Sequence, residues 1–491
     1  MTVSEGDLQA VDVATRLYVD GVEADGEAGA LDVADPARAG VRVGAAAAAS
    51  RAQALGAVAA ARSAFPAWSA LGAQERAARI DAAVAALAPF ADEHAGILAR
   101  ETGKILGEAH GDVFVFSHRC GLATAMADQV DDEVVLPGPP TETVVRYAPL
   151  GVVTIIIPFN WPLAILGASL PYALVAGNTV VVKPPPTAPL ATTRLVQRMA
   201  EQLPPGVLNV VTGADAEIGE ALVANTDVAK VCFTGSPRGG NTIMAMASRT
   251  LTRVALELGG NDPALILADA VLDDAALDGL FHGIFDTTGQ ICMAAKRVYV
   301  HRSRYQEVVD GLSARLERTV LGDGHAPDTT MGPLHAATQK EFVEEIVAEA
   351  RAAGADVREF GALPAGPEFG GGNFVRPSLV LDPDPALRVV TEEQFGPTIP
   401  VIPFDDEDDA VAAANDTWAG LCASVWTADR AKAAEIGARL HAGYVFVNCH
   451  SAAVLDQRAP FGGVKGSGMG REMGIEGLRE FMDTHSIALP S

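Results

Sequence analysis

Continuous apolar runs alternate with amphipathic stretches between Gly151 and Glu257. An apolar run without polar alternation is typical of a strand buried on both faces of a parallel sheet. The stretches between the runs have the length and periodicity of helices. The pattern therefore predicts a doubly wound parallel sheet covered by helices. The predicted strands are 152–157, 179–182, 208–211, 228–233 and 252–256, and the predicted helices are 163–175, 191–203, 217–224 and 240–248.

The same alternation resumes after the paired glycines Gly259 and Gly260 and predicts a second α/β domain. Strands are expected at 265–267, 298–300, 378–381, 399–404, 423–427 and 445–448, with helices near 303–319 and 337–353.

The N-terminal quarter of the chain is rich in good helix formers. It predicts helices over 45–64, 73–87 and 90 to about 125, after a short strand at 17–19 that ends in the turn Asp20-Gly21.

Two short strands, 134–136 and 143–147, flank the Pro/Gly turn 137–140 and predict a β-ribbon. An isolated ribbon is marginally stable. We therefore expect it to pair with another segment, either a neighbouring subunit or the C-terminal stretch 478–489.

The amino-acid composition mainly excludes certain classes of binding partner. The chain has 491 residues, 49% of them hydrophobic and 20% charged, with 36 basic against 62 acidic residues and a net charge of −26. This balance argues against nucleic acid or an anionic membrane as a partner. Helix N-termini and a few lysines can still bind an anionic cofactor.

Five scattered cysteines with no CxxC pair indicate a reducing compartment and no disulfide framework or zinc site. The acidic start, Met1 to Asp7, lacks the apolar segment of a signal peptide, and no apolar run is long enough to span a membrane. We expect a cytoplasmic protein without a bound metal.

Candidate chemistry gathers where the predicted strands end. Asn160 stands between two prolines, Lys183 precedes three prolines, and Glu257 closes the last strand of the first sheet. The glycine-rich turn around Ser236 suits a pyrophosphate. Ligands of such sheets bind at the carboxyl ends of the strands. Taken one at a time, Asn160 is better explained as a turn asparagine and Glu257 as a surface ion-pair glutamate, and Lys183 can be a solvated lysine.

Cys292, in Gly289-Gln290-Ile291-Cys292-Met293, is a thiol on a predicted tight loop. Alone this signal is weak, because a free cysteine is usually an inert, small apolar residue.

Together, in this order, the segments resemble the aldehyde dehydrogenase superfamily over nearly the whole chain. The segments that carry the resemblance are 101–104, 158–162, 183–184, 233–236, 257–262, 289–292, 331–334, 392–397, 460–465, 467–468, 470–472 and 474.

The resemblance implies a Rossmann-like cofactor domain, a second α/β catalytic domain and a small oligomerisation ribbon. The expected boundaries are 1–127 with 148–258 for the NAD(P)-binding domain, 259–460 for the catalytic domain, and 128–147 with 478–491 for the ribbon. The family resemblance also implies a homodimer or homotetramer.

The resemblance assigns catalytic roles that the chemistry supports. Cys292 is expected to attack the aldehyde carbonyl as a thiolate, and the Asn160 amide with the Cys292 backbone N–H to hold the oxyanion. Glu257 is expected to activate the water that hydrolyses the thioester, and also to help deprotonate Cys292. Glu472 matches the family's second carboxylate, which leaves two alternatives, a proton relay or a structural ion pair.

For the cofactor, the resemblance places Lys183 on the adenosine ribose, Ser236 on the pyrophosphate, Glu393 on the nicotinamide ribose and Phe395 beside the nicotinamide. The same groove is expected to include Ile157, Phe159, Gly235 and Gly240.

One departure from the family pattern concerns the choice of cofactor. Pro186 stands where relatives carry the glutamate that binds the adenosine ribose, and Arg238 is close in sequence to the phosphate turn. Since a carboxylate there repels a 2′-phosphate, we hypothesise that NADP is accepted as well as NAD.

By analogy the substrate pocket includes the loop 449–459 and a set of mostly apolar residues. No Arg or Lys adjoins Cys292 in sequence, which favours a medium-sized aliphatic or aromatic aldehyde, although Arg458 would argue otherwise. Two alternatives remain: a CoA-acylating enzyme, which typically lacks the base at 257, and a non-catalytic scaffold. The expected pocket residues are Trp161, Ile165, Ile291, Met293 and Phe461.

Overall fold

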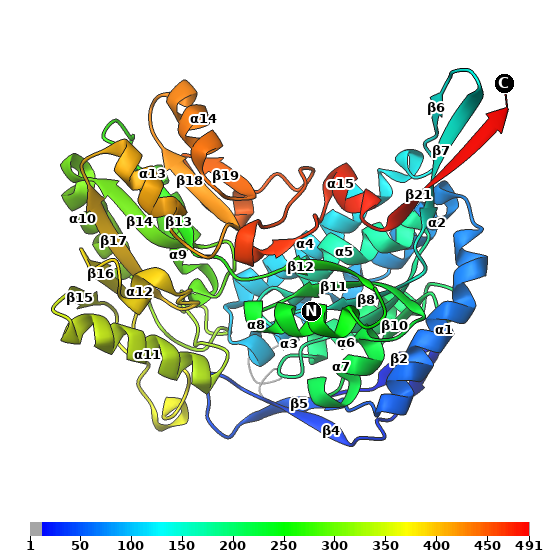
Figure 1. Ribbon diagram of the computed structural model, residues 1–491. Coiled ribbons are helices and arrows are strands. Elements are labelled where there is room, and N and C mark those ends of the chain that lie inside the picture. Colours follow the sequence, from blue (N-terminus) through cyan, green and yellow to red (C-terminus); the bar gives the residue numbers. More distant parts are fainter. Residues whose placement is uncertain (1–11, 491) are drawn as a thin grey trace.

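The computed structural model describes residues 12–490, so the acidic segment Met1 to Asp7 lies outside the described residues. Two large sheets lie side by side in it (Figure 1). The first has eight strands and the second has seven, so the predicted two-part α/β architecture is confirmed. In order across the first sheet the strands are β20 (Gly468–Met469), β12 (Arg253–Glu257), β11 (Val228–Thr234), β8 (Val152–Ile156), β9 (Thr179–Lys183), β10 (Leu208–Val210), β2 (Leu17–Val19) and β3 (Val22–Ala24).

The strand order of the first sheet defines where a ligand should bind. Strands β8, β9 and β10 follow one another toward one edge of the sheet. The chain then returns to the middle and places β11 and β12 on the other side of β8. All five are parallel. The order therefore reverses between β8 and β11, and ligands of such sheets bind in the crevice outside the carboxyl ends at that reversal. Asn160 follows β8 there, and Ser236 follows β11.

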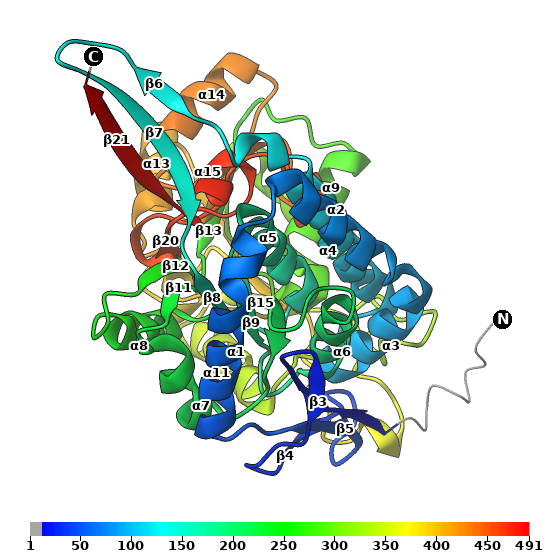
Figure 2. The same cartoon turned by 90° about the vertical axis from the view of Figure 1, so that its right-hand side faces the viewer.

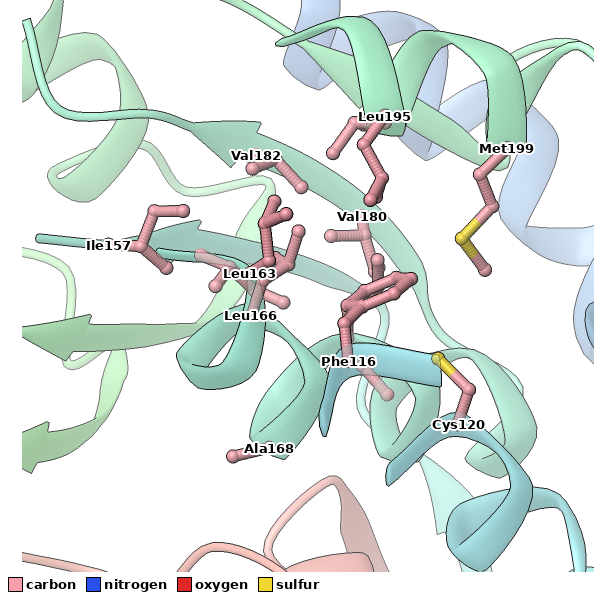
Figure 3. Packing of buried hydrophobic residues seen from close by; sticks show 14 of the residues in the cluster. Phe116, Cys120, Ile157, Leu163, Leu166, Ala168, Val180, Val182, Leu195 and Met199 are labelled. Carbon is pink, nitrogen blue, oxygen red and sulfur yellow. The ribbon is translucent and has the colours of Figure 1, made fainter. Parts of the chain in front are cut away.

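Alternate residues of the buried strands face two different helical layers, as the period of a strand requires. Val152, Ile156 and Val181 pack with helices α1, α7 and α8. Their neighbours Val180 and Val182 pack with α4, α5 and α6, and Figure 3 shows this second layer around Phe116. The helices are α1 (Arg51–Ser69), α2 (Ala73–Ala85), α3 (Ala91–Thr102), α4 (Leu106–Thr124), α5 (Pro162–Ala176), α6 (Leu190–Ala200), α7 (Asp215–Val223) and α8 (Pro237–Ala247).

The second sheet is parallel except at β15, and every strand predicted for it is present. Its strands, in order, are β15 (Asp356–Glu359), β16 (Ser378–Leu381), β17 (Thr398–Phe404), β14 (Ala295–His301), β13 (Asp262–Ile266), β18 (Cys422–Trp426) and β19 (Tyr444–Val447). The helices of this part are α9 (Asp274–Phe285), α10 (Tyr305–Leu316), α11 (Ala337–Ala352), α12 (Arg388–Thr391), α13 (Glu407–Asn415) and α14 (Arg430–Arg439).

The ribbon and the C-terminal segment form one three-stranded sheet, which confirms that the tail supplies the pairing strand. Strand β21 (Met482–Pro490) pairs with β7 (Thr141–Pro149), which in turn pairs with β6 (Val134–Leu136). This sheet projects from the body of the molecule (Figures 1 and 2). The strand is shorter than expected, because Leu478 belongs to helix α15 (Gly474–Arg479).

Several predicted helix boundaries are wrong. Residues 45–47 belong to strand β5 (Arg42–Ala47), which pairs with β1 (Val13–Thr15) and β4 (Ala30–Ala34), and α1 begins only after the capping box of Ser50 with Gln53. The helix expected over 90–125 is divided at Gly103, whose φ of 85° ends α3 in the left-handed conformation. Helix α8 begins three residues earlier than expected, because Ser236 caps it.

No described residue belongs to a helix that is both long and apolar enough to cross a membrane. Between residues 12 and 490, there is no group of three or more His, Cys, Asp or Glu side chains that could hold a metal ion. All five cysteines are free.

Candidate active site

Two cavities meet at Cys292. The smaller, of about 270 Å³, opens at the crevice between β8 and β11, and the larger, of about 360 Å³, lies on the other side of the thiol. Asn160, Glu257 and Cys292 line both cavities. The structure thus brings together three of the four residues for which catalytic roles were considered, although they are far apart in the sequence.

The thiol and the carboxylate come from different sheets. Glu257 ends β12 of the first sheet, whereas Cys292 precedes β14 of the second. The chain crosses between them at Gly259 and Gly260. A Cβ at Gly259 would lie 2.1 Å from a Glu393 oxygen, and one at Gly260 would lie 2.6 Å from the Cys292 carbonyl oxygen. Only glycine fits there, so the paired glycines permit the close approach of the two parts.

The loop that carries Cys292 is strained and firmly held. Thr287, Thr288 and Gly289 all have positive φ (53°, 58° and 74°), which is costly for the two β-branched threonines. The loop is anchored through Trp161 Nε1 to Thr287 Oγ1 at 2.9 Å, Thr288 Oγ1 to Gly332 O at 3.0 Å, Lys296 Nζ to Gly289 O at 2.8 Å, and His450 Nε2 with Met293 O at 3.0 Å.

Burial raises the pKa of the Cys292 thiol to about 12, and the nearby carboxylates of Glu393, Glu257 and Asp262 add to the rise. Lys296 opposes it. Since the thiolate is the nucleophile, the thiol of this resting form is neutral near pH 7 and needs a base to react.

Glu257 has the properties of such a base. It is buried, and neither of its carboxylate oxygens accepts a hydrogen bond from a described residue. Burial, followed by the charge of Glu472, raises its pKa well above the ordinary value. A glutamate with a raised pKa is a stronger base once it is ionised, which suits proton abstraction near neutral pH.

The Asn160 side chain is held with one N–H to spare. Its Nδ2 donates to Gln290 O at 2.8 Å, in the same loop as Cys292. The residue is buried and lines both cavities, and only one hydrogen bond from Nδ2 is made to a described residue. This arrangement matches a donor poised for an oxyanion.

Glu472 also lines the larger cavity, and it accepts from Ser169 Oγ at 2.6 Å. Among the described residues no lysine or arginine forms an ion pair with Glu472, so the structure does not favour the alternative of a structural ion pair. Its pKa is raised by burial.

The smaller cavity contains five of the residues expected at the cofactor. Glu393 accepts from Gly260 N at 3.2 Å, and the rings of Phe159 and Phe395 meet edge to face at 6.2 Å. The donor set fits a dinucleotide: a helix N-terminus for phosphate, a carboxylate for ribose hydroxyls and an aromatic wall. The residues of the set are Phe159, Gly235, Ser236, Glu393 and Phe395.

Three other expected cofactor residues do not line this cavity. Ile157 belongs to the core (Figure 3), and Gly240 packs against Leu258. Lys183 is buried at the end of β9, where its Nζ donates to Asp215 Oδ1 at 2.5 Å. The Lys183 side chain is only 2% exposed, whereas that of Asp215 is 77% exposed. Asp215 was not expected from the sequence.

The larger cavity is lined by all five expected substrate residues, Trp161, Ile165, Ile291, Met293 and Phe461. The loop 449–459 contributes Ala452, Ala453, Leu455 and Gln457 to it. Lys104, from the segment 101–104, lies 4.3 Å over the Trp161 ring and pairs with buried Asp112, which fixes the tryptophan in place.

Two arginines differ in their position relative to the cavity at Cys292. Arg458 is 78% exposed and pairs with Asp456 outside the cavity. Arg119 of α4, absent from the expected set, lines the cavity that contains Cys292. The helical spacing of Val115 and Arg119 places both on one face of α4, a signal that sequence reasoning missed because it did not show what this face contacts.

Comparison with known proteins gives one consistent result. The family model "Aldehyde dehydrogenase family" matches residues 22–487. The glutarate-semialdehyde dehydrogenase of Pseudomonas aeruginosa is 34% identical over 479 residues, 96% of this chain and 97% of that protein. The betaine aldehyde dehydrogenase of Bacillus subtilis is 34% identical over 441 residues, 89% of each chain.

Solved structures agree with this result. An NAD-dependent aldehyde dehydrogenase from Sinorhizobium meliloti superposes with a TM-score of 0.94 at 31% identity, covering 99% of this chain and 96% of that one. A betaine aldehyde dehydrogenase from Staphylococcus aureus, solved in complex with NAD+, superposes with a TM-score of 0.91 at 32% identity, covering 97% and 95%.

Proposed function

The chain belongs to the aldehyde dehydrogenase family, and we propose that it oxidises an aldehyde to the carboxylic acid through a thioester on Cys292, with reduction of NAD(P)+. The observation that supports this most directly is the meeting of two cavities at one thiol, with an unpaired carboxylate and a spare amide N–H beside it.

In the first step, the Cys292 sulfur forms a bond to the aldehyde carbon, and the thiol proton passes to a base. The carbonyl π electrons move to oxygen, and the Asn160 amide stabilises the resulting oxyanion. The chemistry that a bound nicotinamide supplies is the acceptance of a hydride from that carbon. In the smaller cavity Glu393 would hold the nicotinamide ribose, and Phe159 and Phe395 would orient the ring.

In the second step, water attacks the thioester. Glu257 takes a proton from the water, the new C–O bond forms, and the C–S bond breaks with its electron pair passing to sulfur, which releases the acid and regenerates the Cys292 thiolate. Glu472, which lines the larger cavity together with Glu257, is proposed to relay this proton away from Glu257.

The test is the absorbance of NAD(P)H with a panel of aldehydes, without and with CoA. Turnover that does not depend on CoA supports hydrolysis. Turnover only with CoA would instead support the acylating alternative, and no signal with any aldehyde would support the non-catalytic one.

We propose that residues 1–127 with 148–258 bind the cofactor and that residues 259–460 carry the nucleophile. Helices α7 and α8 of the cofactor part pack on the same face of the first sheet as α1. The short β20, from outside both ranges, adds an antiparallel edge to the first sheet and keeps Gly468 opposite Glu257.

For the choice of cofactor, Asp215 weakens the argument for dual use. The carboxylate that Pro186 lacks is present from another segment, bound to Lys183. A 2′-phosphate at this lysine would meet the exposed negative charge of Asp215, and Lys183 is already neutralised by that partner. We therefore propose that NAD is preferred over NADP.

The substitution Asp215→Asn is expected to shift the NADP-to-NAD ratio of kcat/KM toward NADP by about tenfold or more, because it removes a like charge and frees Lys183. Binding of NADPH, followed by quenching of tryptophan fluorescence, should tighten in parallel. The exposed acid Asp227, which pairs with Arg62, gives the matched control Asp227→Asn. Equal use of both cofactors by the unsubstituted protein would revive the dual-use hypothesis.

The projecting ribbon is proposed to hold a homodimer or homotetramer together. Its Val134, Val135 and Leu136 are 46–53% exposed, an apolar edge that a partner would cover. We expect Val135→Lys to reduce the mass measured by light scattering to that of a monomer or smaller oligomer. The matched control is Val271→Lys, at a valine away from the ribbon that is 62% exposed, compared with 51% for Val135. An unchanged mass would show that the ribbon is not the interface.

A further inference from the structure

Arg119 is a partly buried cation whose hydrogen bonds go only to neutral groups. Its Nε donates to Gln457 Oε1 at 2.7 Å, and its Nη1 donates to Ala164 O at 2.6 Å. Across residues 12–490, no carboxylate oxygen lies within 4.0 Å of the guanidinium, and Nη2 has no hydrogen-bond partner. Even partial burial of a cation without an anionic partner is costly, so this arrangement needs an explanation.

A purely structural arginine in the same protein looks different. Arg297 is buried and donates from all three of its nitrogens, to the carbonyl oxygens of Asn261, Ala413 and Ala414. No cavity adjoins it among those described at Cys292. Arg119, by contrast, lines the larger cavity and keeps one nitrogen free.

Three of the acidic groups near Arg119 are already engaged, and a fourth, Glu257 beside Cys292, has no partner among the described residues. Glu472 accepts from Ser169, and Asp112 pairs with Lys104 while accepting from Ala164 N. Asp286, on the wall of the same cavity, pairs with His282. The positive charge of Arg119 is therefore only partly balanced, and the remaining wall toward Cys292 is mostly apolar, with Trp161, Ile165 and Phe461.

We propose that Arg119 binds a carboxylate carried by the substrate, so that the preferred substrate is an aldehyde whose other end is a carboxylate. The apolar walls would hold the hydrocarbon between the two ends, with Gln457 orienting the guanidinium. This inference rests on the proposed function, because it names the substrate of the same site. It replaces the neutral aliphatic or aromatic aldehyde that the sequence favoured.

The first test compares pentanal with 5-oxopentanoate, which differ only in the terminal carboxylate. We expect kcat/KM at least tenfold higher for 5-oxopentanoate, mainly through KM. Arg119→Gln should reduce this ratio by about tenfold to a hundredfold, the effect of losing a charge-assisted hydrogen bond. Arg119→Lys should keep part of the preference for 5-oxopentanoate, since the positive charge remains but the planar guanidinium, which can donate two parallel hydrogen bonds to a carboxylate, is lost.

The matched control is Arg458→Gln, the same change at an exposed arginine outside the cavity, which should leave the ratio unchanged. A ratio near one in the unsubstituted protein, or a ratio that Arg119→Gln does not change, overturns the proposal.

The second test needs no turnover. Glutarate should slow the alkylation of Cys292 by iodoacetamide at concentrations where the uncharged glutaramide does not, and Arg119→Lys should weaken this protection severalfold. Failure of all aldehydes to react, with protection by glutarate intact, would contradict the proposed oxidation but not the carboxylate site. Equal protection by both compounds, or none by either, would contradict the carboxylate site even if aldehydes are oxidised.

Discussion

Replacing Cys292 with alanine is expected to abolish aldehyde oxidation, with a loss in kcat on the order of 10⁴-fold or more. The side chain lies where the two cavities meet, and the loop that carries it is anchored by neighbours other than the sulfur. Cofactor binding should therefore survive, and it can be measured by quenching of tryptophan fluorescence with NADH.

The matched control for this prediction is Cys120→Ala. Cys120 is fully buried in the core beside Phe116 (Figure 3) and lines neither cavity, so its loss should cost stability but not chemistry. If Cys292→Ala retained a substantial part of the activity, the covalent mechanism would be wrong.

The second large effect is expected for Glu257→Gln, which should lower steady-state turnover by about 10² to 10⁴-fold. Since hydride transfer does not need the base for water, one equivalent of NADH per subunit should still appear rapidly and then stop. Trapped protein should carry an added acyl mass on Cys292, and Glu257→Asp, which keeps the carboxylate, should show less accumulation. A slow rate without a burst would place the defect before the thioester.

The same variant separates two effects of Glu257 on Cys292. The charge of the carboxylate helps to raise the pKa of the thiol, so its removal should lower that pKa and speed alkylation by iodoacetamide at a fixed pH. In the unsubstituted protein the alkylation rate should rise about tenfold per pH unit between pH 7 and 9, well below the thiol pKa of about 12. Slower alkylation in Glu257→Gln would instead assign the deprotonation of Cys292 to Glu257.

Much of the fold could be predicted because buried parallel strands are visible in short windows of sequence. The expected strand 378–381 coincides with β16, and 399–404 misses β17 by one residue. Strand β5 was missed because alanine favours helix, whereas pairing with β1 and β4 decides the conformation of residues 45–47. Helices α13 and α14 were missed too, although Asp406 and Asp429 cap their first turns.

Some residues of the candidate site could also be predicted from the sequence, and others could not. Cys292, Glu257 and Asn160 could be found from motifs, and the structure places all three in shared cavities. Asp215 and Arg119 could not be found in this way, because their importance comes from contacts with Lys183 and Gln457, and Gln457 is 338 residues from Arg119. Such contacts depend on how elements pack, which the local pattern around each residue does not encode.

The neutral state of the Cys292 thiol has a consequence for how the protein endures oxidants. Peroxide attacks the thiolate, and sulfinic and sulfonic acids are the irreversible products of that attack. A sulfur whose pKa is held near 12 by burial and three carboxylates exposes almost no thiolate between catalytic cycles. The acidic surroundings that keep Cys292 in the unreactive thiol form therefore also protect it from oxidation. The sulfur is most easily oxidised during a catalytic cycle, when it is a free thiolate.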